Sequence, residues 1–334
     1  MDCEPEELQF LGVVGIYREA GKLLHAWRGL FSKIALYLVL PLSVLFLAHI
    51  HISHILFSSI DSDDAAVERA PPGSPSETRL LDRLASDWAA LLLFKALYLV
   101  ALLALSLLST AAVVYSVASV YSAKELSLPR VLSVVPRVWR RLMVTYLSAF
   151  LLLVAYNALA FALFVLVLFF LAPPDGGVAA AAALVLALAY LAGLVYLSVV
   201  WHLASVVSVL EDAKGFDAMR KSRALIRGKL RTAAAIFVKL NLCFVGVEVA
   251  FRELVVKGRV GGLGARFALA ALMLGLLCAV VLFALVVQTV VYFVCKSHHH
   301  ESIDRGDLAD HLEVYLGEYV PLKAKDVQME QFDL

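Results

Sequence analysis

The residue types best suited to chemistry in this sequence are two groups of histidines. His49, His51 and His54 lie in one apolar run, and the triplet 298–300 follows the last apolar run. Two histidines one helical turn apart can share a metal ion, but no carboxylate or cysteine completes either group at metal-site spacing. Ser/His/Asp, Cys/His and paired-carboxylate sets are also absent at catalytic spacing. The sequence therefore predicts no metal site, no cofactor and no enzymatic activity.

Polar side chains within long apolar runs form a second set of candidates. A polar or ionisable residue at membrane depth is a functional candidate by default, because burying it in hydrocarbon is costly. Asn241, Glu248 and Arg252 share one helical face, which could line a cavity or hold a neighbouring helix, and both interpretations stay open. The intramembrane polar candidates are Asn157, His202, Lys239, Asn241 and Glu248.

Three basic segments connect the apolar runs and supply candidate contacts to a membrane surface. Over 211–231, arginines recur at i, i+3, i+7 and i+11, which places them on one face of a continuous helix, with apolar residues on another face. This pattern is typical of a helix lying on an anionic leaflet, although the same charge could serve only to orient the chain. The candidate lipid or partner contacts are Arg130, Arg137, Arg141, Arg220, Arg223, Arg227 and Arg231.

The elements that position these residues follow from composition. Hydrophobic residues make up 62% of the 334 residues, charged residues only 17%, and mean hydropathy is +0.85. These values indicate a lipid bilayer as solvent, where backbone pairing requires helices of about 20 apolar residues. We predict an all-α fold, a polytopic membrane helical bundle with six transmembrane helices and amphipathic cytosolic connectors. The transmembrane domain covers 34–295, with spans at about 34–57, 89–121, 143–172, 178–210, 232–251 and 267–295.

The distribution of charge predicts the orientation of the bundle. Lysine and arginine are concentrated in 1–33, 122–142 and 211–231, which the positive-inside bias places in the cytosol together with both termini. The segment 252–266 does not follow this bias, because its basic residues would lie on the side of the membrane opposite the cytosol. We expect an amphipathic cytosolic segment over 1–33 and an acidic cytosolic tail over 296–334. The segment 58–88 is too poor in apolar residues to fold alone and is expected to be a mobile, acidic outer loop.

A short phrase recurs three times near the ends of these elements. It reads GVVGIY at 12–17, SVASVY at 116–121 and SVVSVL at 205–210. Small residues spaced in this way permit close approach between membrane helices. We therefore expect the phrases to lie where helices pack together at the inner membrane surface.

Four strings stand out along the chain: FLGVVGIYRE (10–19), WRRL (139–142), HLEVYLGEYVPLK (311–323) and DVQMEQFD (326–333). With these strings the whole chain resembles a family of plant multi-pass transmembrane proteins with no established biochemical function. A looser pattern within 201–239 is similar to the membrane domain fused to some bacterial glycerophosphodiester phosphodiesterases. Their catalytic barrel has no counterpart here, so this resemblance implies only a shared membrane scaffold. The residues that carry the pattern are Glu211, Gly215, Ala218, Ser222, Leu225 and Gly228.

These features favour a non-catalytic integral membrane protein, a scaffold or accessory component that contacts anionic inner-leaflet lipid or a cytosolic partner. The alternative is a transporter or channel for a small or lipid-like molecule, which should show a continuous polar lining across the bilayer. The expected partners are membrane lipids and a cytosolic or membrane protein. A net charge of +1 gives no indication of nucleic acid binding. The plasma membrane and an endomembrane both fit, and no oligomeric state is indicated.

Overall fold

The computed structural model describes residues 7–71, 74–122, 128–171, 177–259 and 262–299. Every regular element in these ranges is helical. Six helical segments among them are long and apolar enough to cross a membrane, and each overlaps a predicted span. The predicted fold class, an all-α membrane helical bundle, is therefore confirmed.

The helices follow one another along the chain with short connections. A 3-10 turn covers Glu7–Phe10, and π-helical turns cover Ala35–Val39 and Arg252–Val256. The α-helices are α1 (Val13–Ala26), α2 (Arg28–Ile34), α3 (Leu40–Arg69), α4 (Pro75–Tyr121), α5 (Leu128–Leu171), α6 (Gly177–Leu210), α7 (Phe216–Leu225), α8 (Leu230–Phe251) and α9 (Leu263–His298).

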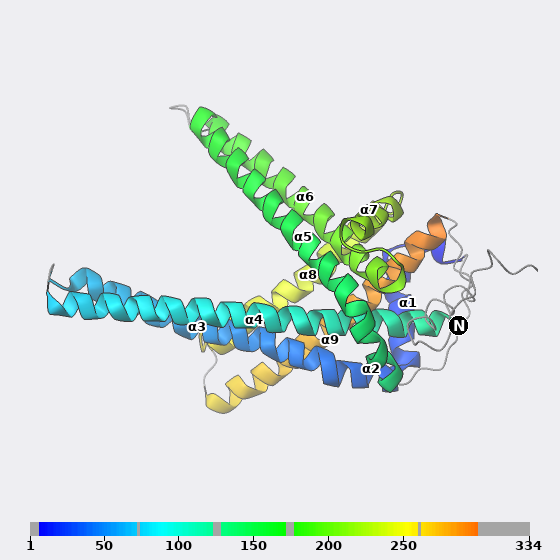
Figure 1. Cartoon of the computed structure of the whole chain (residues 1–334), viewed down its shortest axis with the longest axis horizontal. Coiled ribbons are helices and arrows are strands. Elements are labelled where there is room, and N and C mark those ends of the chain that lie inside the picture. The colour runs from blue at the N-terminus through cyan, green and yellow to red at the C-terminus, as the bar shows by residue number, and fades with distance from the viewer. Residues whose placement is uncertain (1–6, 72–73, 123–127, 172–176, 260–261, 300–334) are drawn as a thin grey trace, which may run out of the picture.

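The long helices form three antiparallel pairs, α3–α4, α5–α6 and α8–α9. Figure 1 shows the three pairs diverging from one shared end of the molecule, where α1, α2 and α7 also lie. We call this end the hub, and it comprises α1, α2, α7, residues 107–120 of α4, 199–210 of α6 and 286–297 of α9. Nearly all side chains of these three helix ends are buried. The core of the protein therefore sits in the hub rather than along the pairs.

Two of the three repeated phrases, at 116–121 and 205–210, lie in this core, as their small residues predicted. Ser116 and Ser119 of α4 and Ser205 and Ser208 of α6 are all buried. Each hydroxyl donates a hydrogen bond to a carbonyl one turn back in its own helix, at distances between 2.7 and 2.9 Å. The hydroxyls are thus satisfied locally, which lets the helices pack closely without an unpaired polar group. The third phrase opens α1, which packs against α9.

The prediction of a mobile loop over 58–88 is wrong. In the structure α3 continues to Arg69 and α4 begins at Pro75. The Ser74 hydroxyl caps α4 by accepting a hydrogen bond from the Glu77 amide at 3.2 Å, and Ser59 donates to Asp87 across the pair at 2.8 Å. Low apolar content misled the prediction, because capping and contacts with the partner helix support each helix where a lone segment would stay unfolded.

The predicted surface helix over 211–231 is shorter in the structure than the sequence indicated. Helix α7 ends at Leu225, and a turn that contains Gly228 at φ +92° leads into α8. A positive φ is compatible with glycine but breaks a right-handed helix. The connector over 122–142 forms a longer helix than expected, because residues 128–142 continue directly into the third span as part of α5. Residues 300–334, which hold most of the expected acidic tail, lie outside the described residues.

Candidate functional site

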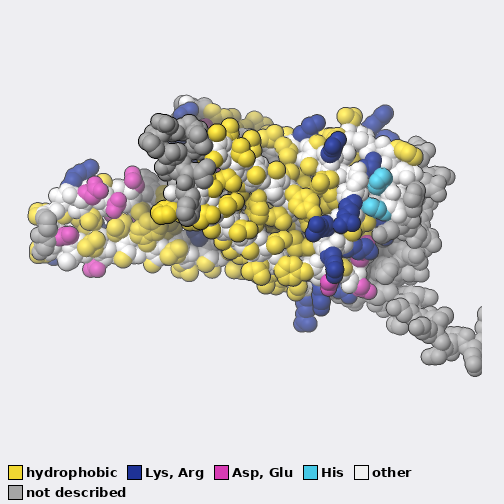
Figure 2. All heavy atoms as spheres, turned by 90° about the horizontal axis from the view of Figure 1, so that it is seen from above, with side chains coloured by type: hydrophobic (Ala, Val, Ile, Leu, Met, Phe, Trp, Pro, Cys, Tyr) yellow, Lys and Arg dark blue, Asp and Glu magenta, His cyan; other side chains and the backbone are white. Residues whose placement is uncertain are grey.

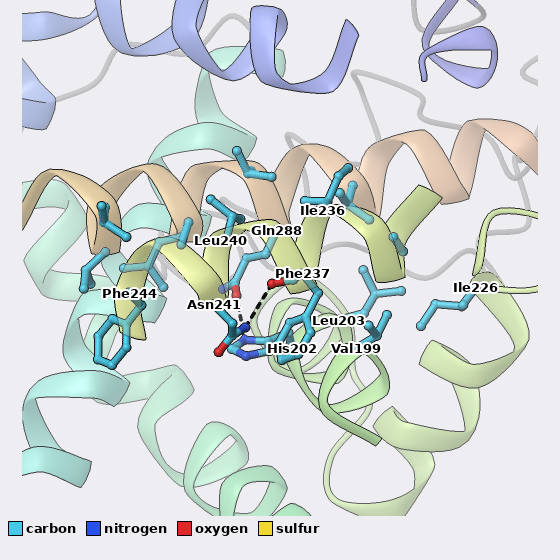
Figure 3. Close-up of a pocket in the computed structure, with 17 residues that line it drawn as sticks. Val199, His202, Leu203, Ile226, Ile236, Phe237, Leu240, Asn241, Phe244 and Gln288 are labelled. Atoms are coloured by element: carbon cyan, nitrogen blue, oxygen red, sulfur yellow. Dashed lines mark hydrogen bonds between the residues drawn. The ribbon is translucent and has the colours of Figure 1, made fainter. Parts of the chain in front are cut away.

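A cavity of about 290 Å³ lies between α6, α8 and α9. Figure 3 shows it extending from Ile226, beside the start of α8, to Phe244, almost four turns along α8. His202 and Asn241 on its wall are exposed, so the cavity opens on the side of the bundle. Its remaining lining is mostly apolar and consists of Val199, Leu203, Ala233, Ile236, Phe237, Leu240, Val280, Val281, Ala284, Leu285, Val287, Gln288 and Val291.

Three helices each contribute one polar side chain to this cavity. The Nδ1 atom of His202 in α6 lies 3.1 Å from the Oε1 atom of Gln288 in α9. The carboxamide of Asn241 in α8 donates from Nδ2 to the carbonyl of Phe237 at 3.0 Å (Figure 3). His202 and Asn241 are among the candidates from the sequence, whereas Gln288 is not, although its polar side chain within an apolar run is the signal that could have found it. The fold thus converts three isolated polar positions into one site.

The other intramembrane candidates do not join this site. Asn157 lies on α5 and accepts a hydrogen bond from the Tyr190 hydroxyl of α6 at 2.8 Å, while its own amide donates to the carbonyl of Leu153. These bonds sit beside a hollow of about 510 Å³ on the α5–α6 pair. Glu248 pairs with Arg252 on its own helix at 2.9 Å, and Lys239 is exposed on α8. Asn157 and Glu248 therefore serve local contacts.

A further polar group lies on the α3–α4 pair. Lys95 Nζ lies 2.8 Å from His49 Nε2 and 2.9 Å from Ser53 Oγ, and the His49 ring stacks on Tyr98 with 3.7 Å between centroids. The imidazole is engaged by a cation and an aromatic face. Within the described ranges, no group of three or more His, Cys, Asp or Glu side chains is arranged to hold a metal ion.

Glu211 organises the hub at the end of α6. Its carboxylate lies 2.5 Å from Lys221 of α7 and 3.9 Å from Lys296 of α9, and it accepts a hydrogen bond from the Tyr292 hydroxyl at 2.5 Å. Only 14% of the Glu211 side chain is exposed. This single acidic group therefore ties α7 and α9 to the end of α6.

The turn after Glu211 is held just as firmly. Gly215 adopts φ +60°, and its amide donates to Thr145 Oγ1 at 2.8 Å. Thr145 also bonds Ser208 at 2.6 Å, and the buried Ser222 hydroxyl donates to the carbonyl of Val200 at 2.8 Å. Residues of the looser sequence pattern thus position α7 against α5 and α6. Their roles in the structure are packing and turn formation.

The basic residues of the connector follow this turn along the chain. Arg220 and Arg223 lie on α7, Arg227 lies in the following turn, and Arg231 lies in the first turn of α8. All four are exposed, and none forms an ion pair within the described part of the chain. Arg141 differs, because it pairs with Asp212 at 2.5 Å. Two further candidates, Arg130 and Arg137, have side chains outside the described residues.

The basic residues at the far end of the α8–α9 pair are neutralised locally. Arg252 pairs with Glu248, while Lys257 and Arg259 both pair with Glu253, at 2.5 and 3.1 Å. These pairs reduce the uncompensated charge of the segment 252–266, whose basic residues run against the charge bias, because two carboxylates neutralise part of it. Figure 2 shows many lysine and arginine side chains across one side of the apolar body, with some acidic side chains beside them, and further acidic side chains at the opposite tip, on the α3–α4 pair.

No curated protein and no solved structure matches the chain. Similarity to plant proteins or to glycerophosphodiester phosphodiesterases is therefore not shown. A family model described as a domain of unknown function (DUF8558) matches residues 1–332. That range spans the hub, all three helix pairs and the site between α6, α8 and α9. The chain belongs to the DUF8558 family.

Proposed function

We propose that this protein is a non-catalytic membrane scaffold whose hub contacts anionic headgroups of the inner leaflet. The observation that carries the proposal is the set of four exposed arginines at 220, 223, 227 and 231, which form no ion pair among the described residues. Free arginines beside an apolar body match the chemistry of a leaflet rich in anionic lipids. In this orientation both termini lie in the cytosol, at the plasma membrane or an endomembrane.

The four arginines can contribute substantial binding free energy to an anionic membrane surface. Each lysine or arginine near an anionic membrane surface contributes about 1 kcal/mol. Four arginines then contribute about 4 kcal/mol, which corresponds to nearly a thousandfold in affinity. Because the buried face of α7, including Ala218, Ser222 and Leu225, anchors the connector to the hub, the cations are held in place before lipid binds. A fixed arrangement avoids part of the ordering cost of binding.

The distribution of polar groups supports a scaffold over a transporter or channel. Transport across the bilayer requires a continuous polar lining, whereas the described polar groups form separate clusters on different helices. Asn157 belongs to the α5–α6 pair, Lys95 to the α3–α4 pair, and His202 to the cavity at α8 and α9. Apolar side chains fill the hub core between them.

Lipid retention by purified full-length protein tests this proposal. The protein, extracted in a neutral detergent, is mixed with phosphatidylserine or phosphatidylcholine, and the bound lipids are counted by native mass spectrometry. Combined replacement of Arg220, Arg223, Arg227 and Arg231 by glutamine should abolish the preference for phosphatidylserine. A control with Arg252, Lys257 and Arg259 replaced by glutamine should keep it, since each of these cations already pairs with a carboxylate of the protein. Equal preference in the wild type and the fourfold variant contradicts the proposal.

The orientation is tested separately. An epitope tag at the C-terminus should be protected from external antibody in intact cells or sealed vesicles and become accessible after permeabilisation. A tag in the turn between α3 and α4 should behave in the opposite way. Exposure of both tags on the same side would contradict the proposed arrangement, because α4 spans the apolar body from that turn to the hub, where α9 ends.

A further inference from the structure

The cavity between α6, α8 and α9 contains hydrogen-bonding atoms that the described side chains leave unused. Gln288 Oε1 can only accept, so His202 Nδ1 must donate to it, which leaves Nε2 of the neutral ring as a free acceptor. The Gln288 amide nitrogen is then a free donor. Asn241 donates to a carbonyl through Nδ2, so its Oδ1 atom is a second free acceptor. Two acceptors and one donor thus meet in a single apolar space.

These atoms require a partner because of where they lie. The helices that carry them have the length and apolar character of membrane spans. An unpaired polar group in hydrocarbon is costly, and lipid tails provide no hydrogen-bonding atoms. The hollow on α5–α6 differs in this respect, since the Asn157 carboxamide there uses both its oxygen and its nitrogen in bonds to the protein. The unmatched set therefore distinguishes the α6/α8/α9 cavity as a binding site.

The lining also defines the charge and size of the occupant. Among the described residues that line the cavity there is no lysine, arginine, aspartate or glutamate, so an ionic headgroup would find no counterion in this lining. A volume of about 290 Å³ lies at the lower end of the range for small-molecule sites. Its elongated form between Ile226 and Phe244 suits one narrow chain, and its side opening allows entry from the bilayer (Figure 3).

We propose that this cavity binds an uncharged single-chain lipid with a free hydroxyl group. The hydroxyl donates to His202 Nε2 or Asn241 Oδ1 and accepts from the Gln288 amide, which are the two roles that a hydroxyl can fill at once. The chain lies against the apolar residues along the cavity. This site uses none of the surface arginines, so it is independent of the proposed contact with anionic headgroups.

Photocrosslinking tests the proposal on the full-length protein in nanodiscs of phosphatidylcholine. The probe is a monoacylglycerol with a diazirine in its chain, and crosslinked peptides are mapped by mass spectrometry. Crosslinks should concentrate on α6, α8 and α9 and be displaced by unlabelled monooleoylglycerol. Methyl oleate, which has a similar chain but no hydroxyl, should compete about tenfold less well, the loss expected for one hydrogen bond.

Variants place the binding in this cavity. Gln288→Leu removes the donor and should weaken displacement by monooleoylglycerol about tenfold, whereas Ala284→Phe should abolish specific crosslinking by filling the cavity. Asn157→Leu, on the α5–α6 pair, is the matched control and should behave as wild type. The proposal is overturned if crosslinks spread evenly over the lipid-facing helices, or if methyl oleate competes as well as monooleoylglycerol. Both readouts use wild-type protein, so they decide the outcome even if a variant fails to fold.

Discussion

Replacing Glu211 by alanine should destabilise the protein by about 3 kcal/mol. The carboxylate accepts a hydrogen bond from Tyr292, and such a bond to a charged group contributes about 1.5–3 kcal/mol. The substitution also removes the acidic neighbour of Lys296, which is 22% exposed, while the more exposed Lys221 adds at most about 1 kcal/mol. Glu211→Gln keeps an acceptor for Tyr292 and should cost about half as much.

The adjacent carboxylate provides a matched control. Asp212 pairs with Arg141 at 2.5 Å, as close as Glu211 lies to Lys221, but 73% of its side chain is exposed. Exposed ion pairs contribute about 0–1 kcal/mol. Asp212→Ala should therefore change stability by less than about 1 kcal/mol, although it removes the same chemical group one residue away.

Unfolding of the purified protein in mixed micelles with increasing sodium dodecyl sulfate measures these differences. Trp139 and Trp201, which pack against the hub core, report unfolding by fluorescence. A double-mutant cycle of Glu211→Ala with Tyr292→Phe, each of which removes the bond, should give a coupling energy of at least about 0.5 kcal/mol, as expected for residues in direct contact. Equal losses for Glu211→Ala and Asp212→Ala would refute the explanation, because they would show that burial in the hub has no influence on the bond.

Four further substitutions probe the glycines, a helix cap and the pH response. Gly215→Ala should destabilise the protein by more than about 1 kcal/mol in the same titration, because φ is +60° and the new Cβ would lie 3.1 Å from two side-chain atoms of α5. Gly246→Ala is the control: it has open space around it and should be neutral or stabilising. Ser74→Ala should cost about 1 kcal/mol and speed hydrogen exchange in the first turn of α4, and unchanged exchange would contradict its capping role. Burial raises the pKa of Tyr17 above its usual 10.0. The stabilising contribution of the neutral Tyr17 side chain is therefore complete below pH 10.0 and is lost as the pH rises towards the folded-state pKa. Tyr17→Phe should flatten the decline of the unfolding midpoint at alkaline pH.

Hydropathy and small-residue patterns predicted those features of the structure that depend on a single segment of the chain. Each membrane span requires only a run of apolar residues long enough to cross the hydrocarbon, so all six helices could be found from hydropathy. The serine phrases likewise predicted close packing, since small side chains lower the distance between helices whichever helix lies opposite. The serines at 116, 119, 205 and 208 are accordingly buried in the hub.

Errors arose where a neighbouring element decides the conformation. Residues 58–69 and 75–88 are helical because each helix packs on the other and Ser74 caps the second, which the polar composition of 58–88 does not reveal. The arginine stripe over 211–231 assumed one continuous helix, but Gly228 ends that regularity. Charge counting also treated the basic residues of 252–266 as free, whereas three of the four form ion pairs with Glu248 or Glu253.

The sequence by itself determined that this protein is a helical membrane protein with six apolar spans and basic connectors, because hydropathy and charge act on each segment separately. Only the tertiary structure decided which polar residues act together. His202 and Gln288 are separated by 86 positions along the chain, yet α6 and α9 bring them within hydrogen-bonding distance, and α8 places Asn241 on the wall of the same cavity. Contacts over such separations depend on how whole helices pack, and packing is a property of the assembled hub rather than of any one helix.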